Sequence, residues 1–337
     1  MAVTCSNVTI DPRGDLKLTV GKEEDGTRVT FLVCSRALAR TSPVFERMLY
    51  GNFKESQDSP KENTDWEVEL QNERPTTMEI LFNITHSNLA KVPRILPIDE
   101  LYYLTICTNY YDTTHLLAFW ADSWLSSIDD IARDANALMP KLLWIFWEFG
   151  RREQLQAVAD RMLLEWKGPL DIQAWHMSDL HTPLDVIDRI DELRTTTIEK
   201  LLGVFSQMIN HLTIVDEGPR WCQHASFMSH HRCESIILGS MTFCLMRAGL
   251  WPIPAAQDMT YSIQGLYAKL TNLVIHDLGE VQQKPMVDHT GCNPAQFLLD
   301  HIRQVMENIP STLSEEQIRH LDKQALKRYP LLEHTTE

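Results

Sequence analysis

Two neighbouring segments near the amino terminus, Gly14–Val20 and Arg28–Val33, carry apolar residues at every second position. Strict alternation is typical of a strand with one buried face. The glycines and acidic residues at 21–27 favour a hairpin turn between them. A third alternating segment, Trp66–Leu70, follows later in the chain. The sequence therefore predicts a small sheet with one face packed against other elements.

Between the second and third predicted strands, the sequence marks the start of a helix. Ser42 suits the N-cap position and Pro43 the first helical position. Apolar residues then recur at helical spacing as far as Gly51, which ends the helix. Further helical patterns cover residues 76–88, 98–113 and 115–128. The order strand, strand, helix, strand and then helices predicts an α+β domain.

Residues beyond about 127 carry apolar side chains at helical spacing almost throughout. The predicted segments are 138–166, 187–212, 233–252, 262–278 and 293–309. The first is either one long helix or a pair broken near Gly150, and the helix within 233–252 stops at Gly249. We therefore expect a mainly α-helical region from 127 to 337.

The charge and cysteine content exclude several classes of protein. A net charge of −15 argues against general binding to nucleic acid or to an acidic membrane surface. Apolar runs such as Leu142–Trp147 are far shorter than the roughly 20 residues of a membrane span. The first residues show no secretory signal, and the 7 cysteines are expected to stay reduced. These features predict an intracellular protein, cytoplasmic or nuclear.

The first part of the chain resembles the BTB/POZ domain, especially the form found in filamentous-fungal proteins. The residues that carry the resemblance are Gly14-Asp15-Leu16, Phe31–Val33, Leu38 with Ser42–Phe45, Asn52–Glu55, and Asn109-Tyr110 before Leu116, Trp120 and Trp124. The pattern covers residues 11–126, and segments of 127–337 loosely resemble the tail of the same fungal proteins. The resemblance implies a protein–protein interaction module that acts as an adaptor or a scaffold.

The resemblance also implies two ways of binding partners. BTB adaptors of cullin ubiquitin ligases carry a hydrophobic-x-acid triplet before a helix, and Ile98-Asp99-Glu100 occupies that place here. The alternative is that these residues only cap the helix after Pro97. Self-association of BTB domains would use residues 6–10 and Arg36–Arg40. A homodimeric scaffold without cullin binding is therefore the competing hypothesis.

A possible metal site lies in the helical region. His289 and Cys292 have a short spacing, and Cys222 and Cys233 would complete a Cys3His set suited to structural Zn²⁺, which would stabilise segment 222–292. His224 is the substitute ligand if one of these is absent from the site. In the alternative interpretation Cys233 and Cys244 are small buried apolar groups and the histidines face solvent.

Catalysis is not expected from this sequence. The Gly-x-Ser-x-Gly, Gly-x-Gly-x-x-Gly, P-loop and His-Glu-x-x-His motifs are all absent. A metal-dependent enzyme built on the Cys/His cluster would need an open coordination position and a nearby acid, for which Asp288 is the local candidate. The sequence therefore favours a non-catalytic interaction protein.

Overall fold

A computed structural model describes residues 6–22, 28–56, 66–129, 136–170, 180–214, 218–224, 229–281 and 287–328. Cys5 and most of the predicted hairpin turn at 21–27 lie outside these ranges. The chain divides into two compact units. Unit 1 contains Met1–Val158, Trp175–Pro183 and Glu315–Glu337, and unit 2 contains Ala159–Ala174 and Leu184–Ser314.

Unit 1 contains a four-stranded mixed sheet in the order β1-β3-β2-β4. The strands are β1 (Ser6–Thr9), β2 (Leu16–Val20), β3 (Val29–Val33) and β4 (Glu67–Leu70). β2 pairs antiparallel with β3 in the register Leu18↔Phe31, whereas β1 and β4 add parallel edges. The alternating segments of the sequence thus form strands as predicted, because their apolar residues share one buried face.

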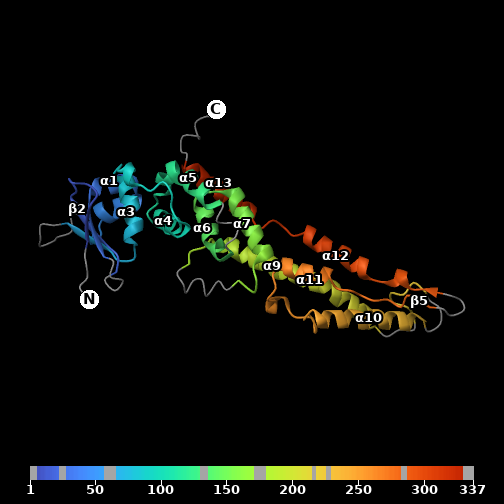
Figure 1. Ribbon diagram of the computed structural model, residues 1–337. Helices are drawn as coiled ribbons and strands as arrows, with labels where there is room; N and C mark the ends of the chain where they lie inside the picture. Colours follow the sequence, from blue (N-terminus) through green and yellow to red (C-terminus); the bar gives the residue numbers. More distant parts are fainter. Residues whose placement is uncertain are drawn as a thin grey trace, which may run out of the picture. The chain divides into compact units, whose positions relative to one another are not determined.

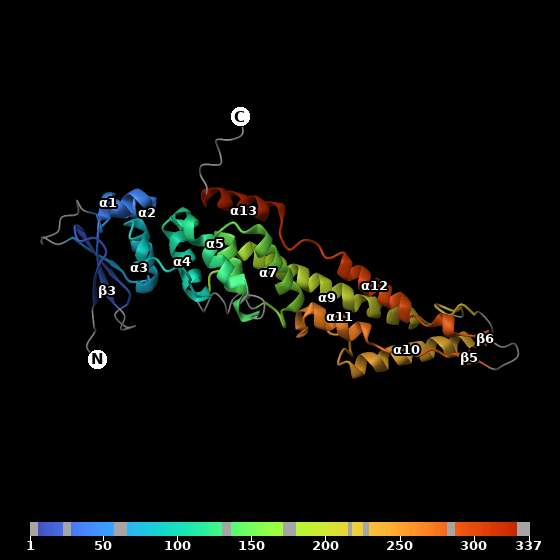
Figure 2. The same ribbon diagram turned by 45° about the horizontal axis from the view of Figure 1, so that its top comes forward.

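The helices of unit 1 follow in the order α1 (Ser35–Thr41), α2 (Pro43–Tyr50), α3 (Pro75–Thr85), α4 (Ile98–Tyr110), α5 (Ala118–Asp129), α6 (Met139–Glu148) and α13 (Glu315–Arg328), with short 3-10 turns η1 (Leu89–Lys91), η2 (Thr114–Leu117) and η3 (Asn136–Leu138). α3 lies against one face of the sheet (Figures 1 and 2). Phe31 of β3 meets Phe82 of α3 edge to face, at 5.3 Å between ring centroids. This contact lies in the core of the sheet and its helices.

Ser42 has two roles at the start of α2. Its hydroxyl oxygen accepts the backbone N–H of Phe45 at 3.1 Å, as the sequence predicts for an N-cap. The same hydroxyl donates to the backbone carbonyl of Tyr111 at 2.6 Å, and the side chain is buried. One serine therefore both begins α2 and joins it to the end of α4.

Replacing Ser42 by alanine should destabilise unit 1 by about 2 kcal/mol, because a helix cap and a buried hydrogen bond are lost together. Thermal unfolding followed by calorimetry measures the change. Ser126→Ala is the control, since the Ser126 hydroxyl is exposed and donates to the carbonyl of Ser123 in its own helix. Equal melting of the two variants would contradict the proposed double role.

The break between α6 and α7 (Arg152–Glu165) falls at Gly150, which confirms the helix-pair alternative. Gly150 has φ +62°, a left-handed conformation that favours glycine. A Cβ at this position would lie 2.4 Å from the backbone nitrogen of Ala325 in α13. Glycine is therefore required both for the turn and for the close approach of α13.

Unit 2 is mainly helical. Its elements are α9 (Leu184–Leu212), α10 (Ser229–Arg247), η4 (Ala256–Asp258), α11 (Ile263–Thr271), β5 (Glu280–Val281), β6 (Val287–Asp288), η5 (Thr290–Cys292) and α12 (Ala295–Glu307). α9 packs against α10, α11 and α12. The buried guanidinium of Arg194 in α9 donates to the carbonyls of Met259 and Tyr261. α10 stops before Gly249, at φ +73°, as predicted. Within the ranges that the structure describes, no helix has the length and apolar character of a membrane span.

Candidate metal centre

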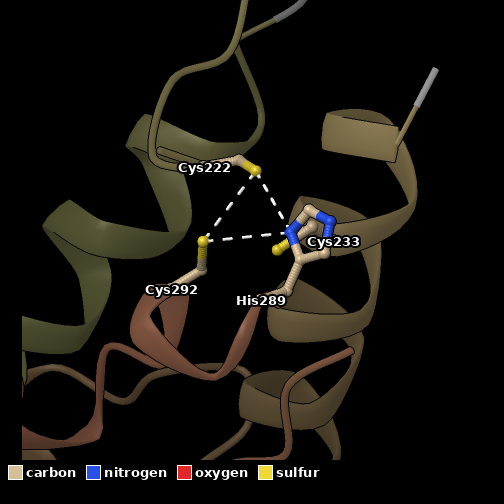
Figure 3. A group of neighbouring side chains, drawn as sticks. All are labelled: Cys222, Cys233, His289 and Cys292. Atoms are coloured by element: carbon tan, nitrogen blue, oxygen red, sulfur yellow. Dashed lines mark hydrogen bonds between the residues drawn. The ribbon is translucent and has the colours of Figure 1, made fainter. Parts of the chain in front are cut away.

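Four side chains from separate parts of unit 2 meet in one buried cluster, the Cys3His cluster: Cys222, Cys233, His289 and Cys292. Figure 3 shows the three sulfurs and the His289 ring turned toward a common point. All four donor atoms lie within 4.8 Å of one another. The structure thus brings together the same four residues that the sequence analysis selected.

Different elements position the four donors. Cys222 lies in the segment after α9, and Cys233 lies in the first turns of α10. His289 follows β6 and precedes η5, which ends at Cys292. The backbone N–H of Cys292 donates to the carbonyl of His289 at 2.9 Å, so a tight turn brings this His and Cys to one side. Asp288 begins the turn, since its carboxylate accepts the backbone N–H and the hydroxyl of Thr290.

The separations suit a tetrahedral metal ion. The Cys222 Sγ lies 3.5 Å from Nδ1 of His289 and 3.9 Å from Sγ of Cys292, and Cys292 Sγ lies 3.9 Å from the same nitrogen. A Zn²⁺ ion with bonds of about 2.3 Å to sulfur and about 2.0 Å to nitrogen gives tetrahedral edges of about 3.8 Å between two sulfurs and about 3.5 Å between sulfur and nitrogen. The donors therefore need little movement to bind one ion.

The buried environment of the cluster disfavours the charged forms of its side chains. Burial raises the pKa of the Cys233 thiol, and the neighbouring Cys222 and Cys292 raise it further. Burial also raises the pKa of the Cys222 thiol and lowers that of the His289 imidazole. These shifts favour the neutral thiol forms of Cys222 and Cys233 when no cation is bound. A divalent ion reverses this preference, because it stabilises thiolates directly.

Glu234 fixes the position of the Cys222 segment. Its Oε1 accepts the backbone N–H groups of Arg220, Trp221 and Cys222 at 2.7, 2.7 and 3.0 Å. Burial alone would raise the pKa of Glu234, but these N–H donors outweigh burial and hold the pKa below its usual value. The carboxylate next to Cys233 on α10 thus orients the loop that supplies another sulfur.

Trp221 links the segment that contains Cys222 to Cys292. Its indole Nε1 donates to the backbone carbonyl of Cys292 at 2.7 Å. Neither Glu234 nor Trp221 was predicted from the sequence. An acid beside a buried cysteine on a predicted helix was the available signal for Glu234, but its partners lie 12 to 14 residues earlier in an irregular segment.

Replacing Glu234 by alanine should weaken zinc binding roughly 10- to 100-fold, as removal of groups that orient metal ligands commonly does. Competition with a chelator of known affinity measures the change. Glu199→Ala on the exposed surface of α9 is the matched control and should leave the affinity unchanged. An unaltered zinc affinity in the Glu234 variant would show that the three N–H bonds do not position Cys222.

His224 and Asp288 lie beside the cluster. The ring of His224 meets that of His289 at 5.0 Å between centroids, but His224 is not among the four donors that lie within 4.8 Å of one another. The Asp288 carboxylate accepts bonds from Thr290 and begins the turn. Four protein donors complete a tetrahedron, which is the pattern of structural rather than catalytic zinc.

Cys244 and Cys107 stand apart from the cluster. Cys244 of α10 is half-buried, and its thiol donates to the carbonyl of Val274 at 2.6 Å. Cys107 is buried in unit 1 near the sulfur of Met78. Cys34 is half-buried at the start of α1.

The triplet Ile98-Asp99-Glu100 forms the first turn of α4 in unit 1. Ile98 is buried, with 7% of its surface exposed. The Asp99 carboxylate pairs with Nζ of Lys141 on α6 at 2.6 Å, and Glu100 accepts the hydroxyl of Thr76 at 3.4 Å. Contacts within unit 1 therefore engage all three residues.

Comparison with protein families matches residues 14–122 to the BTB/POZ domain. A search among curated proteins gave no match to the chain. The amino-terminal part of the chain is a BTB/POZ domain, which confirms the predicted resemblance to this domain, and a mainly helical region follows it as predicted. BTB/POZ domains are protein–protein interaction modules, so this part of the chain is assigned to that class.

Proposed function

We propose that the chain is a non-catalytic intracellular adaptor or scaffold with two interaction surfaces. The BTB/POZ domain binds one protein, and unit 2, stabilised by structural Zn²⁺, presents a second surface. The observation that carries the interaction role is the BTB/POZ match at residues 14–122. Reduced thiols, as in an intracellular compartment, would keep the Cys3His cluster competent to bind metal.

Structural Zn²⁺ is the ion that the donors of the Cys3His cluster favour. Three sulfurs and one imidazole are soft and borderline ligands, which select zinc over magnesium or calcium. Each of the four side chains is at least 95% buried, so they form a closed site without solvent access. Purified chain analysed by plasma mass spectrometry should contain one zinc ion per molecule.

The contacts made by the first turn of α4 help to distinguish an adaptor from a scaffold. A cullin would have to contact Ile98 and Glu100, but Ile98 is buried and α6 packs on α4. Lys141 of α6 also forms an ion pair with Asp99. This packing argues against a cullin contact at the triplet, whereas the position of the triplet at the first turn of α4 favours an adaptor.

Calorimetry with the BTB-class cullin of a filamentous fungus separates the two forms. Glu100→Arg is a sharper variant than Ile98→Arg, because Ile98 is buried and its replacement would disturb the fold. Glu79→Arg on the exposed surface of α3 is the matched control. Cullin binding that only Glu100→Arg abolishes identifies an adaptor. A chain that sediments as a dimer and does not bind cullin is a scaffold. A chain that neither binds cullin nor forms a dimer would contradict the proposed role of the BTB domain.

A further inference from the structure

Helix α10 exposes an apolar face, which we call the α10 strip: Ile236, Gly239, Phe243 and Met246. The exposed fractions of Ile236, Phe243 and Met246 are 37%, 59% and 57%. Spacings of three and four residues place all four on one side of the helix. A Cβ at Gly239 would meet nothing within 4 Å, so the middle of the strip is open.

The opposite face of α10 already packs within unit 2. Its buried residues are Cys233, Ile237, Met241 and Leu245, each at most 1% exposed. These recur every four residues, about half a turn away from the α10 strip. α10 therefore does not need the strip for its own packing, and exposed large apolar side chains grouped in this way mark an interaction site.

A hollow of about 510 Å³ lies beside the carboxyl end of the α10 strip. Cys244, Arg247, Lys269 and Val274 contribute to its walls, and Val274 is 63% exposed. The guanidinium of Arg247 lies 5.8 Å from the ring centroid of Phe243, so the hollow and the strip are neighbours. Together they form one continuous surface with an apolar centre.

Basic residues lie beside this apolar surface, although the protein has a net charge of −15. Arg247 and Lys269 line the hollow, and Arg232 is exposed one helical turn before Ile236. The one acidic residue of α10, Glu234, is buried and occupied by three backbone N–H groups. A partner that fits this surface must combine apolar side chains with acidic groups.

We propose that the α10 strip and the hollow bind an acidic amphipathic helix of another protein. Its apolar side chains would pack over Gly239 and between Ile236 and Phe243, and its carboxylates would meet Arg247 and Lys269. A second copy of α10 would bring basic residues against basic residues, which disfavours self-association here. The inference rests on the proposed function, because it names the partner of unit 2.

The test uses the zinc-loaded full-length chain and two panels of fluorescein-labelled helical peptides. Both panels carry leucines at three- and four-residue spacing, with glutamates flanking them in one panel and lysines in the other. Fluorescence anisotropy should show saturable binding by members of the acidic panel. Phe243→Ser with Met246→Ser should weaken it roughly tenfold or more, and so should Arg247→Glu at low salt. Ile214→Ser, which alters an apolar side chain 50% exposed outside the strip, should have no effect.

Several results would overturn the proposal. They are no binding by any acidic peptide, equal binding of both panels, and binding that the strip variants leave unchanged. Binding to phosphatidylserine vesicles that the same variants abolish would instead assign the surface to lipid. Zinc content, sedimentation and cullin binding of each variant are measured in parallel. If zinc is bound and the chain dimerises or binds cullin, but no peptide binds, only this inference is rejected. If acidic peptides bind but the chain neither dimerises nor binds cullin, the proposed function is rejected instead.

Discussion

A Cys292→Ser chain is expected to lose its zinc and much of the thermal stability of unit 2. Cys292 is fully buried, and serine would replace one of three sulfur ligands with a weaker oxygen donor. Structural zinc contributes on the order of 10 kcal/mol to the folding of small metal-binding domains. If only about 4 kcal/mol of this is lost from unit 2, the melting temperature falls by roughly 8–16 °C.

The separation of the ligands in sequence explains the size of this effect. Cys222 and Cys292 are 70 residues apart, and the segment between them includes α10 and α11. A metal ion that joins both ends of such a segment removes the entropy of a long loop from the unfolded chain. Because Cys233 is also a ligand, the ion would attach the start of α10 to both ends of the segment between Cys222 and Cys292.

Metal analysis and differential scanning calorimetry check this prediction. Cys244→Ser is the matched control, because Cys244 lies outside the Cys3His cluster and a serine hydroxyl can still donate to the carbonyl of Val274. Chelation of the wild-type protein should reproduce the fall in melting temperature, and added Zn²⁺ should reverse it. A Cys292→Ser chain that keeps one zinc, or a wild-type chain that binds none, would refute the metal centre.

The four residues of the Cys3His cluster could be predicted from the sequence, whereas the groups that position them could not. Few residue types bind zinc, so His289 with Cys292 pointed to a site although the spacing of Cys222 and Cys233 fits no standard motif. Glu234 accepts hydrogen bonds from backbone N–H groups, and a sequence pattern does not indicate such backbone partners. The role of Glu234 is apparent only from the structure, in which α10 lies next to the segment that leads to Cys222.

The same limit applies to the fold. Alternation and caps predicted β2, β3, β4 and α2, because those signals are local, whereas the edge strand β1 was not predicted. α13 was not predicted as a helix, since its sequence is largely polar and its packing depends on a distant partner. That partner is the turn at Gly150, where the approach of Ala325 leaves no room for a side chain. The expected boundary at 126 marks where the family pattern ends, and it carries no information on how α6 and α13 pack in unit 1.

Glu148 of α6 is a buried acid in unit 1, with only 2% of its surface exposed. Asn109 of α4 donates to its Oε2 at 2.8 Å, and the hydroxyl of Thr114 donates to Oε1. Lys327 of α13 is a nearby positive charge, and Asp112 is a nearby negative one. The carboxyl group therefore lies where α4, η2 and α6 meet.

Burial raises the pKa of Glu148 to about 7, although the bonds from Thr114 and Asn109 act in the opposite direction. In the unfolded chain the pKa returns to about 4.5. Between these two values the folded state binds more protons, so stability falls as the pH rises. The contribution of Glu148 is fully present below about pH 4.5 and is lost through pH 7, a change of about 3 kcal/mol.

Glu148→Gln should therefore remove most of this pH dependence and stabilise unit 1 by up to about 3 kcal/mol at pH 8, with little effect at pH 4.5. The glutamine oxygen can still accept from Asn109, and its amide can donate to the Thr114 hydroxyl. Calorimetry across this pH range measures the difference, with Glu153→Gln on the exposed side of α7 as control. If both variants follow the wild-type pH profile, Glu148 is already ionised in the folded protein at pH 5, and the packing of α6 on α4 tolerates its charge.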